Sequence, residues 1–281
     1  MARVTGARAT RFAPSPTGPL HLGHAFAALT AAARGDRFLL RIEDIDTARS
    51  KPEFEAALYD DLHWLGLSWE TPVLRQSERL GLYQQTIDRL TENGLTYHCA
   101  CTRGDIRAAL SAPQEGAPVI GPDGPVYPGT CRHAGHPDGA LRLDMAKAMA
   151  HLGEISFTDT GTRPGLHRRS AADMIREIGD IVLARRDIGT SYHIAVVTDD
   201  AAQGITEVTR GEDLFDATFI HALLIRLLSL PQPVWHHHRL IRDQSGKRLA
   251  KRDDARALAK YRSEGASPAD ISRILDLSLS S

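Results

Sequence analysis

The sequence predicts an alternating α/β protein with an inserted subdomain and a small helical C-terminal part. Three observations support this. A loop at residues 11–24 leads into a helical run, Ala25 to Arg34, and a strand pattern follows at 37–43, which is the order of an α/β domain. The alternation stops near residue 95, and residues 113–139 are rich in proline and glycine. Strand-like runs then return after residue 180.

Each predicted element depends on its own pattern. Phe38, Leu40 and Ile42 alternate with other residues as in a strand. A first helix is expected near 54–65, and a second is expected to begin at Ser77 as N-cap, to bury Leu80, Ile87 and Leu90, and to end at Asn93-Gly94. The later expectations are strands at 95–101, 180–185, 192–198, 205–208 and 235–241, and helices at 217–229 and from Ser267.

Composition excludes several classes of protein. The 281 residues suggest roughly two folding units, and 34 basic against 35 acidic side chains give no nucleic-acid signal in the whole chain. Residues 1–10 have arginines but no apolar stretch of the signal-peptide kind, and no run is long enough to span a membrane. Three cysteines do not make a disulfide framework. A cytoplasmic location is expected.

The loop at residues 11–24 reads Arg-Phe-Ala-Pro-Ser-Pro-Thr-Gly-Pro-Leu-His-Leu-Gly-His. Its prolines and glycines exclude a helix interior, so it delivers the chain into the N-terminus of the next helix. Such a terminus has unpaired N–H groups and binds phosphate. Gly18 and Gly23 allow close approach of the backbone, and His21 and His24 supply donors. Spacing alone leaves open a Pro-rich connector before a core helix.

Glu43 ends the strand at 37–43, and strand C-termini face the ligand crevice in such sheets. A carboxylate there suits a cationic amine, although a solvated carboxylate fits the pattern equally well. Asp46 and Thr47 are interpreted as turn caps.

Cys99, Cys101 and Cys131 make an incomplete zinc set, because structural zinc sites have four ligands. Candidates for the fourth ligand are His98, His133, His136 and Tyr127. The alternative is three buried, inert cysteines. Zinc is favoured because the segment is rich in proline and glycine and has little core of its own.

Residues 239–262 contain nine Lys and Arg against three Asp, a local balance of about +6. A glycine-containing loop with paired cations can close on a polyphosphate, whereas a solvated, charged helix start is the alternative. The run His236-His237-His238 is interpreted as strand-edge histidines and not as a metal cluster, since neighbours on a strand point to opposite faces.

Three motifs together resemble the class I glutamyl-tRNA synthetases over residues 10–258. They are the stretch at 12–24, the strand end Arg41-Ile42-Glu43-Asp44 and the late basic loop. His21-Leu22-Gly23-His24 is similar to the HIGH signature, and Arg248-Leu249-Ala250-Lys251-Arg252 to the KMSKS loop. Arg248 replaces the first lysine of that loop and Ala250 its serine, whereas Lys251 is kept. The resemblance implies a Rossmann-type nucleotide-binding fold with a parallel sheet.

Within this family the chain looks more like the short glutamyl-queuosine tRNA(Asp) synthetases. Only 29 residues follow Arg252, whereas full-length glutamyl-tRNA synthetases continue into an anticodon-binding domain. Cys99, Cys101, Tyr127 and Cys131 also match the zinc site of the short enzymes, in which tyrosine is the fourth ligand. The expected ranges are 1–96 and 166–238 for the two catalytic halves, 97–165 for the zinc-bearing insert, and 239–281 for the basic loop and C-terminal helices.

The resemblance implies a two-step reaction. ATP and L-glutamate form glutamyl-adenylate, and the glutamate then passes to queuosine in the anticodon of tRNA(Asp). The implied glutamate-binding residues are Arg11, Phe12, Ala13, Pro14, Ser15, Glu43, Tyr192 and Arg210. The implied ATP-binding residues are His21, Gly23, His24 and Lys251, of which the histidines and the lysine are catalytic. Mg²⁺ would accompany ATP, one structural Zn²⁺ would be bound, and a monomer is expected.

Three other functions remain open at this point. A truncated glutamyl-tRNA synthetase would charge the 3′ end of tRNA(Glu). A nucleotidyltransferase also uses a His-X-Gly-His loop, but does not need Glu43, Tyr192 and Arg210. An inactive zinc-containing RNA-binding module is allowed by the substitutions at Arg248 and Ala250.

Overall fold

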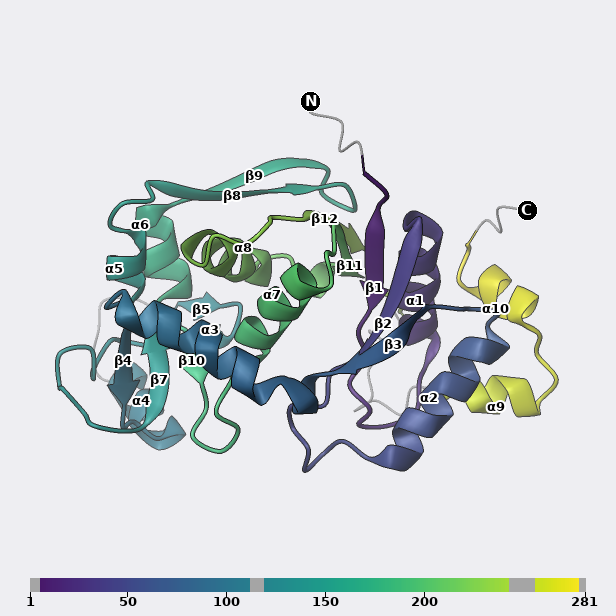
Figure 1. The fold of residues 1–281 in the computed structure, drawn as a ribbon, viewed down its shortest axis with the longest axis horizontal. Helices are drawn as coiled ribbons and strands as arrows, with labels where there is room; N and C mark the ends of the chain where they lie inside the picture. Colours follow the sequence, from purple (N-terminus) through teal and green to yellow (C-terminus); the bar gives the residue numbers. More distant parts are fainter. Residues whose placement is uncertain (1–5, 112–118, 243–255, 278–281) are drawn as a thin grey trace.

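The centre of the molecule is a parallel sheet in two segments (Figure 1). The computed structural model describes residues 6–111, 119–242 and 256–277. The first segment has the order β1 (Ala9–Phe12), β2 (Arg37–Ile42), β3 (Glu70–Arg75). The second has the order β11 (Glu207–Gly211), β12 (Val234–His238), β8 (Glu154–Asp159), β9 (Gly165–Ser170). Every pair is parallel except the hairpin β8–β9.

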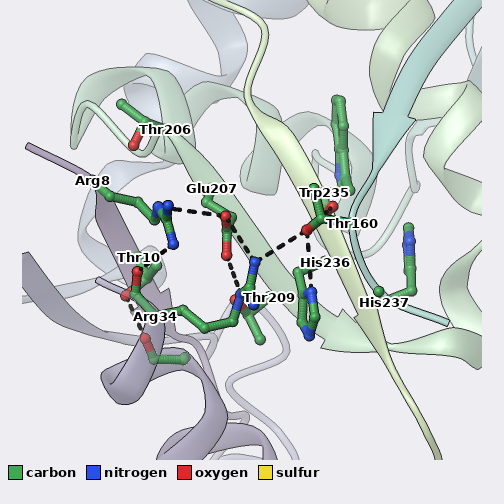
Figure 2. A network of polar contacts seen from close by, with 12 residues as sticks. Arg8, Thr10, Arg34, Thr160, Thr206, Glu207, Thr209, Trp235, His236 and His237 are labelled. Atoms are coloured by element: carbon green, nitrogen blue, oxygen red, sulfur yellow. Dashed lines mark hydrogen bonds and ion pairs between the residues drawn. The ribbon is translucent and has the colours of Figure 1, made fainter. Parts of the chain in front are cut away.

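Contacts between β1 and β11 join the two segments. The Thr206 N–H donates to the Ala9 carbonyl at 3.0 Å, and the Ala9 N–H donates to Thr206 Oγ1 at 2.9 Å. Figure 2 shows Glu207 on β11 between Arg8 and Arg34, so that its buried carboxylate ties β11 to the first segment. The predicted parallel sheet is therefore confirmed, with its topological switch between β1 and β11.

Both faces of the first segment are covered, and strand alternation decides which side chains lie on which face. Phe38, Leu40 and Ile42 pack with α1 (Leu22–Arg34) and α2 (Pro52–Trp64) in one core. Leu39 lies in the other core, with α3 (Leu80–Glu92), α7 (Tyr192–Ala202) and α8 (Ala217–Leu227). Arg41 shares the face of Leu39 and is therefore wholly buried.

The inserted region forms its own antiparallel sheet. Its order is β10 (Val182–Ala184), β7 (Ala140–Leu143), β4 (Thr96–Cys99). Its other elements are α4 (Arg103–Ser111), the hairpin β5 (Ile120–Gly121) and β6 (Gly124–Pro125), α5 (Met145–Met149), α6 (Ala171–Asp173) and the π-helix Met174–Ile178. Strands from both sides of residue 165 share sheets, and the division into four ranges stays a prediction.

The C-terminal part is helical, with α9 (Leu258–Ser263) and α10 (Pro268–Ile274) beside α2 (Figure 1). Ser267 caps α10 in a capping box with Asp270, as its Ser-Pro start predicts. Leu258 and Ile271 complete the core on the α2 side. Within the described ranges, none of the helices is both long and apolar enough to cross a membrane.

The predicted strand at 192–198 is wrong, because this segment is the helix α7. Ser191 caps it by accepting from the Ile194 N–H, and residues 193–200 are all buried. A run that is buried all round has no helical or strand periodicity, so the sequence pattern does not distinguish the two. The neighbouring strand also begins later than predicted, at Glu207.

The predicted start of the second helix needs a correction. Ser77 lies in the 3₁₀ turn Gln76–Arg79, and its N–H and hydroxyl donate to the Asp44 carboxylate at 2.8 and 2.6 Å. α3 begins at Leu80, which is 44% exposed and not on the buried face. Its end at Asn93 is confirmed.

The histidines of β12 do not lie at a sheet edge. β12 pairs along its whole length with β11, and Trp235 pairs with Asp159 of β8 on the other side. His237 is wholly buried, and its Nδ1 lies 2.9 Å from Asp159 Oδ1. His236 on the opposite face contacts Thr160 (Figure 2).

Candidate active site at the carboxyl edge of the sheet

A cavity of about 480 Å³ opens where β1, β2, β11 and β12 end. Most of the predicted site residues line it: Arg11, Phe12, Ala13, Ser15, His21, Gly23, His24, Glu43, Tyr192 and Arg210. Pro14 does not line the cavity, but its carbonyl accepts from the Glu43 N–H at 2.9 Å and so fixes the loop to the end of β2. The structure thus brings together residues that lie up to 199 positions apart, from Arg11 to Arg210.

Both histidines of the loop cap the N-terminus of α1. His21 is the N-cap, and its Nδ1 accepts from the Gly23 N–H at 3.1 Å. The Nδ1 of His24 accepts from the His21 N–H at 3.2 Å. The two rings lie 3.8 Å apart at the cavity wall. Because each Nδ1 accepts, neutral rings have their protons on Nε2, which suits donation to a phosphate.

A buried ion network lies behind the cavity. Asp200 on α7 accepts from Arg11 Nε at 2.9 Å and Nη2 at 3.3 Å, and from Arg41 Nη1 at 2.7 Å. Arg41 Nη2 in turn donates to Glu43 at 3.1 Å. Burial raises the pKa of Glu43 despite the two arginines. Arg41 and Arg11 oppose this effect of burial, and a ligand ammonium beside Glu43 would favour its ionised form further.

Replacing Asp200 with alanine is expected to lower the free energy of unfolding at pH 7 by about 3–5 kcal/mol, because it leaves two buried arginines without their shared counterion. Burial opposes ionisation of Asp200, but Arg11 and Arg41 outweigh it and lower its pKa to about 2. The pKa of an aspartate in the unfolded chain is about 4, so the ionised Asp200 stabilises the folded state fully above pH 4. This stabilisation is lost as the pH falls from 4 to 2.

Urea unfolding at several pH values measures this effect, with Asp88→Ala, an exposed carboxylate on α3, as the control. The difference between wild type and Asp200→Ala should shrink below pH 4. A difference that stays constant down to pH 2 would contradict the assignment.

Arg210 differs from Arg11 in having no anionic partner. Its guanidinium donates to His237 Nε2, His221 Nδ1, Thr218 Oγ1 and the Leu214 carbonyl. Within the described ranges, no carboxylate forms an ion pair with it. Burial lowers its pKa, yet an arginine stays charged. A buried cation of this kind is stabilised by an anionic ligand, whereas Arg11 is already neutralised by Asp200.

Cys99, Cys101 and Cys131 form a second candidate site in the inserted region. Their sulfur atoms all lie within 4.8 Å of one another, and Cys101 and Cys131 are 3.4 Å apart. The Tyr127 hydroxyl lies 3.3 Å from Cys99 Sγ and 3.5 Å from Cys101 Sγ. Ligands at tetrahedral zinc with 2.3 Å bonds are about 3.8 Å apart, so the three thiols and the phenol fit one ion.

The histidines offered as a fourth ligand lie elsewhere. His98, His133 and His136 line a separate cavity of about 390 Å³ with Tyr97 and Arg132. None of them belongs to the group of mutually close ligand atoms found in the described part of the chain.

The KMSKS-like residues, Lys251 included, lie outside the described residues. The chain on either side of them lies at the cavity. Leu240 and Ile241 line it, and Ala257 pairs with His21 in an isolated bridge.

Sequence reasoning missed several polar residues at the site. Asp213 and His238 line the cavity, and Asp200, His221 and His237 hold its two arginines. An Asp-Asp pair at 199–200 within an apolar run was the one available signal, because a buried carboxylate requires a partner.

Comparison with known proteins agrees with this geometry. Residues 8–137 and 168–278 match the family model of class I tRNA synthetases (E and Q), catalytic domain. A glutamyl-Q tRNA(Asp) synthetase of Rhodobacter capsulatus is 62% identical over 95% of this chain and 99% of its own length. One of Nocardia farcinica is 42% identical over 96% of this chain and 84% of its own length.

Solved structures show the same fold. A glutamate tRNA ligase of Elizabethkingia meningosepticum in complex with its amino acid has a TM-score of 0.71 and 27% identity, over 93% of this chain. The chain spans 58% of the length of that protein. A methionyl-tRNA synthetase of Mycobacterium tuberculosis, 12% identical over 95% of this chain and 63% of its own length, has a TM-score of 0.59 and shares the fold alone. The chain belongs to the glutamyl-Q tRNA(Asp) synthetases, ligases of the class I tRNA synthetase family.

Proposed function

We propose that this chain activates L-glutamate with ATP and transfers it to queuosine in the anticodon of tRNA(Asp). The observation that supports this most is Arg210, a buried cation at the cavity wall whose partners are neutral. One carboxylate of glutamate would pair with it, and Glu43, facing the same cavity, would take the ammonium group. The other carboxylate is then left to react.

In the first step, the free carboxylate oxygen attacks the α-phosphorus of ATP, and pyrophosphate leaves with its electron pair. His21, Gly23 and His24 lie at the N-terminus of α1, where phosphate groups bind favourably. Mg²⁺ would be held largely by the phosphates of ATP, as such sites usually are. Positioning and charge stabilisation supply the catalysis, since the adenylate is itself the activated species.

The acceptor distinguishes this function from a truncated glutamyl-tRNA synthetase that charges tRNA(Glu). The relative from R. capsulatus favours queuosine, because the two chains match over almost their whole lengths. The test labels tRNA with radioactive glutamate, comparing tRNA(Asp) with and without queuosine and tRNA(Glu). Label on queuosine-containing tRNA(Asp) alone is expected. Labelling of tRNA(Glu) in its place would favour the truncated glutamyl-tRNA synthetase. If the chain also catalyses no glutamate-dependent exchange between ATP and pyrophosphate, an inactive RNA-binding module would be favoured.

We also propose that Cys99, Cys101, Cys131 and Tyr127 hold one structural zinc ion. The purified chain should contain one zinc per molecule, and Cys131→Ser should lose it. Tyr127→Phe should weaken retention during dialysis against a chelator, whereas His133→Ala should not, because His133 lies at the separate cavity. Elemental analysis measures all three variants. Loss of zinc from His133→Ala but not from Tyr127→Phe would contradict the ligand set.

A further inference from the structure

Arg210 lies at one end of a line of hydrogen bonds that runs into the inserted region. Its Nη1 donates to Nδ1 of His221 on α8 at 2.9 Å. Nε2 of His221 lies 3.0 Å from Nδ1 of His193, the second residue of α7. Nε2 of His193 lies 2.9 Å from Oδ2 of Asp123, in the turn between β5 and β6. The line thus joins the glutamate site to a hairpin of the inserted region.

The direction of every bond in this line follows from its first donor. A guanidinium only donates, so Nδ1 of His221 accepts, and a neutral His221 has its proton on Nε2. That proton is donated to Nδ1 of His193, so His193 also has its proton on Nε2 and donates it to Asp123. Burial and the charge of Arg210 hold the pKa of His221 well below its usual value, which keeps the ring neutral. All three bonds therefore run from the cation to the carboxylate.

A second histidine holds Arg210 from the other side. Nε2 of His237 accepts from Arg210 Nε at 3.3 Å, and Nδ1 of His237 lies 2.9 Å from Asp159. Both residues of this pair are buried within the sheet. Asp123, in contrast, has a side chain that is 51% exposed. The line through His193 is therefore the one whose outer end faces solvent.

Asp123 also borders the substrate site. It lines, with His193, a cavity of about 520 Å³ that shares Ser15, Glu43 and Tyr192 with the cavity at the carboxyl edge. A displacement of the β5–β6 hairpin would thus change both the wall of this cavity and the outer end of the hydrogen-bonded line.

We propose that Asp123, His193 and His221 form a positioning relay that orients the Arg210 guanidinium for glutamate, so that the β5–β6 hairpin sets glutamate affinity. This rests on the proposed function, in which Arg210 takes a glutamate carboxylate. Asp123 and His193 do not line the cavity at the carboxyl edge of the sheet. They act through Arg210, as positioning residues.

Nitrogen NMR tests the line itself, independently of activity. Long-range ¹H–¹⁵N correlations of the whole chain at pH 7 should show His193 and His221 as neutral rings protonated on Nε2. Asp123→Ala should shift the His193 signals most. A proton on Nδ1 of either ring would reverse a bond and overturn the relay.

Steady-state ATP–pyrophosphate exchange tests the role. Asp123→Ala, at an exposed position, should raise KM for glutamate about 2- to 10-fold and leave KM for ATP unchanged. Asp123→Glu should restore part of the affinity, and Asp88→Ala on α3 should have no effect. Adding His193→Ala to Asp123→Ala should give little further change, because both break the same line.

These experiments distinguish failure of the proposed function from failure of the relay. If the wild-type chain shows no glutamate-dependent exchange, both the proposed function and the role of the relay are rejected. The NMR measurement of the histidine tautomers still tests the hydrogen-bonded line itself. If the wild type is active but Asp123→Ala leaves KM for glutamate unchanged, the relay alone is rejected. Additive effects of Asp123→Ala and His193→Ala on that KM would also reject the relay alone.

Discussion

Replacing Arg210 with alanine is expected to lower kcat/KM for glutamate in ATP–pyrophosphate exchange by about 10²–10³-fold. Arg210 is a buried cation without an anionic partner in the described part of the chain, so a glutamate carboxylate would be its counterion. Removing the guanidinium leaves that carboxylate desolvated and unpaired. KM for ATP should change little, since His21 and His24 lie on a different element, the N-terminus of α1.

Two further variants make this result specific. Arg210→Lys keeps the charge but not the planar fork, so its kcat/KM should fall between those of wild type and Arg210→Ala. Arg226→Ala removes an exposed arginine from α8 and should leave exchange unchanged. A circular dichroism melt shows whether each variant is folded. Equal losses of affinity for glutamate and ATP in a folded Arg210→Ala would contradict a glutamate-specific role.

Arg11 and Arg210 show which part of the candidate site could be predicted from the sequence alone. Arg11 and Arg210 were equivalent candidates for carboxylate recognition, because the family resemblance implies a glutamate-binding role for both. They differ in their ion pairs: Asp200, which lies 189 positions from Arg11, pairs with it, whereas no carboxylate of the described residues pairs with Arg210. A contact of that range depends on how α7 packs against the sheet. Since the sequence of α7 predicts a strand, no local pattern indicated the pairing of Arg11 with Asp200.

The loop at the start of α1 was predictable for the opposite reason. Its prolines and glycines exclude regular structure, and the helix that follows is local in sequence, so the loop-to-helix geometry at Gly23 needs no distant partner. Glu43 was predictable because a strand end in a parallel sheet faces the crevice. The burial of Arg41 was not predictable. Alternation places Arg41 on the face of β2 opposite Leu40 and Ile42, but does not show that α7 covers that face.

Lys251→Ala is expected to abolish adenylate formation, with a loss of at least about 10²-fold in kcat, and to leave folding unchanged. A lysine of the KMSKS-like loop would stabilise the negative charge that moves onto pyrophosphate, and this charge develops only in the transition state. kcat and kcat/KM should therefore fall together, with KM for glutamate near its wild-type value. This result would differ in kind from that of Arg210→Ala, where affinity for glutamate is lost.

The described chain on both sides of this loop supports the expectation. Ile241 lines the cavity, and Ala257 pairs with His21 at the N-terminus of α1. Lys260→Ala, on the exposed side of α9, is the matched control, because its ammonium pairs with Glu264 on the same helix end. Exchange is measured over a range of glutamate concentrations at saturating ATP. Wild-type rates in Lys251→Ala would remove the basis for assigning the loop to pyrophosphate.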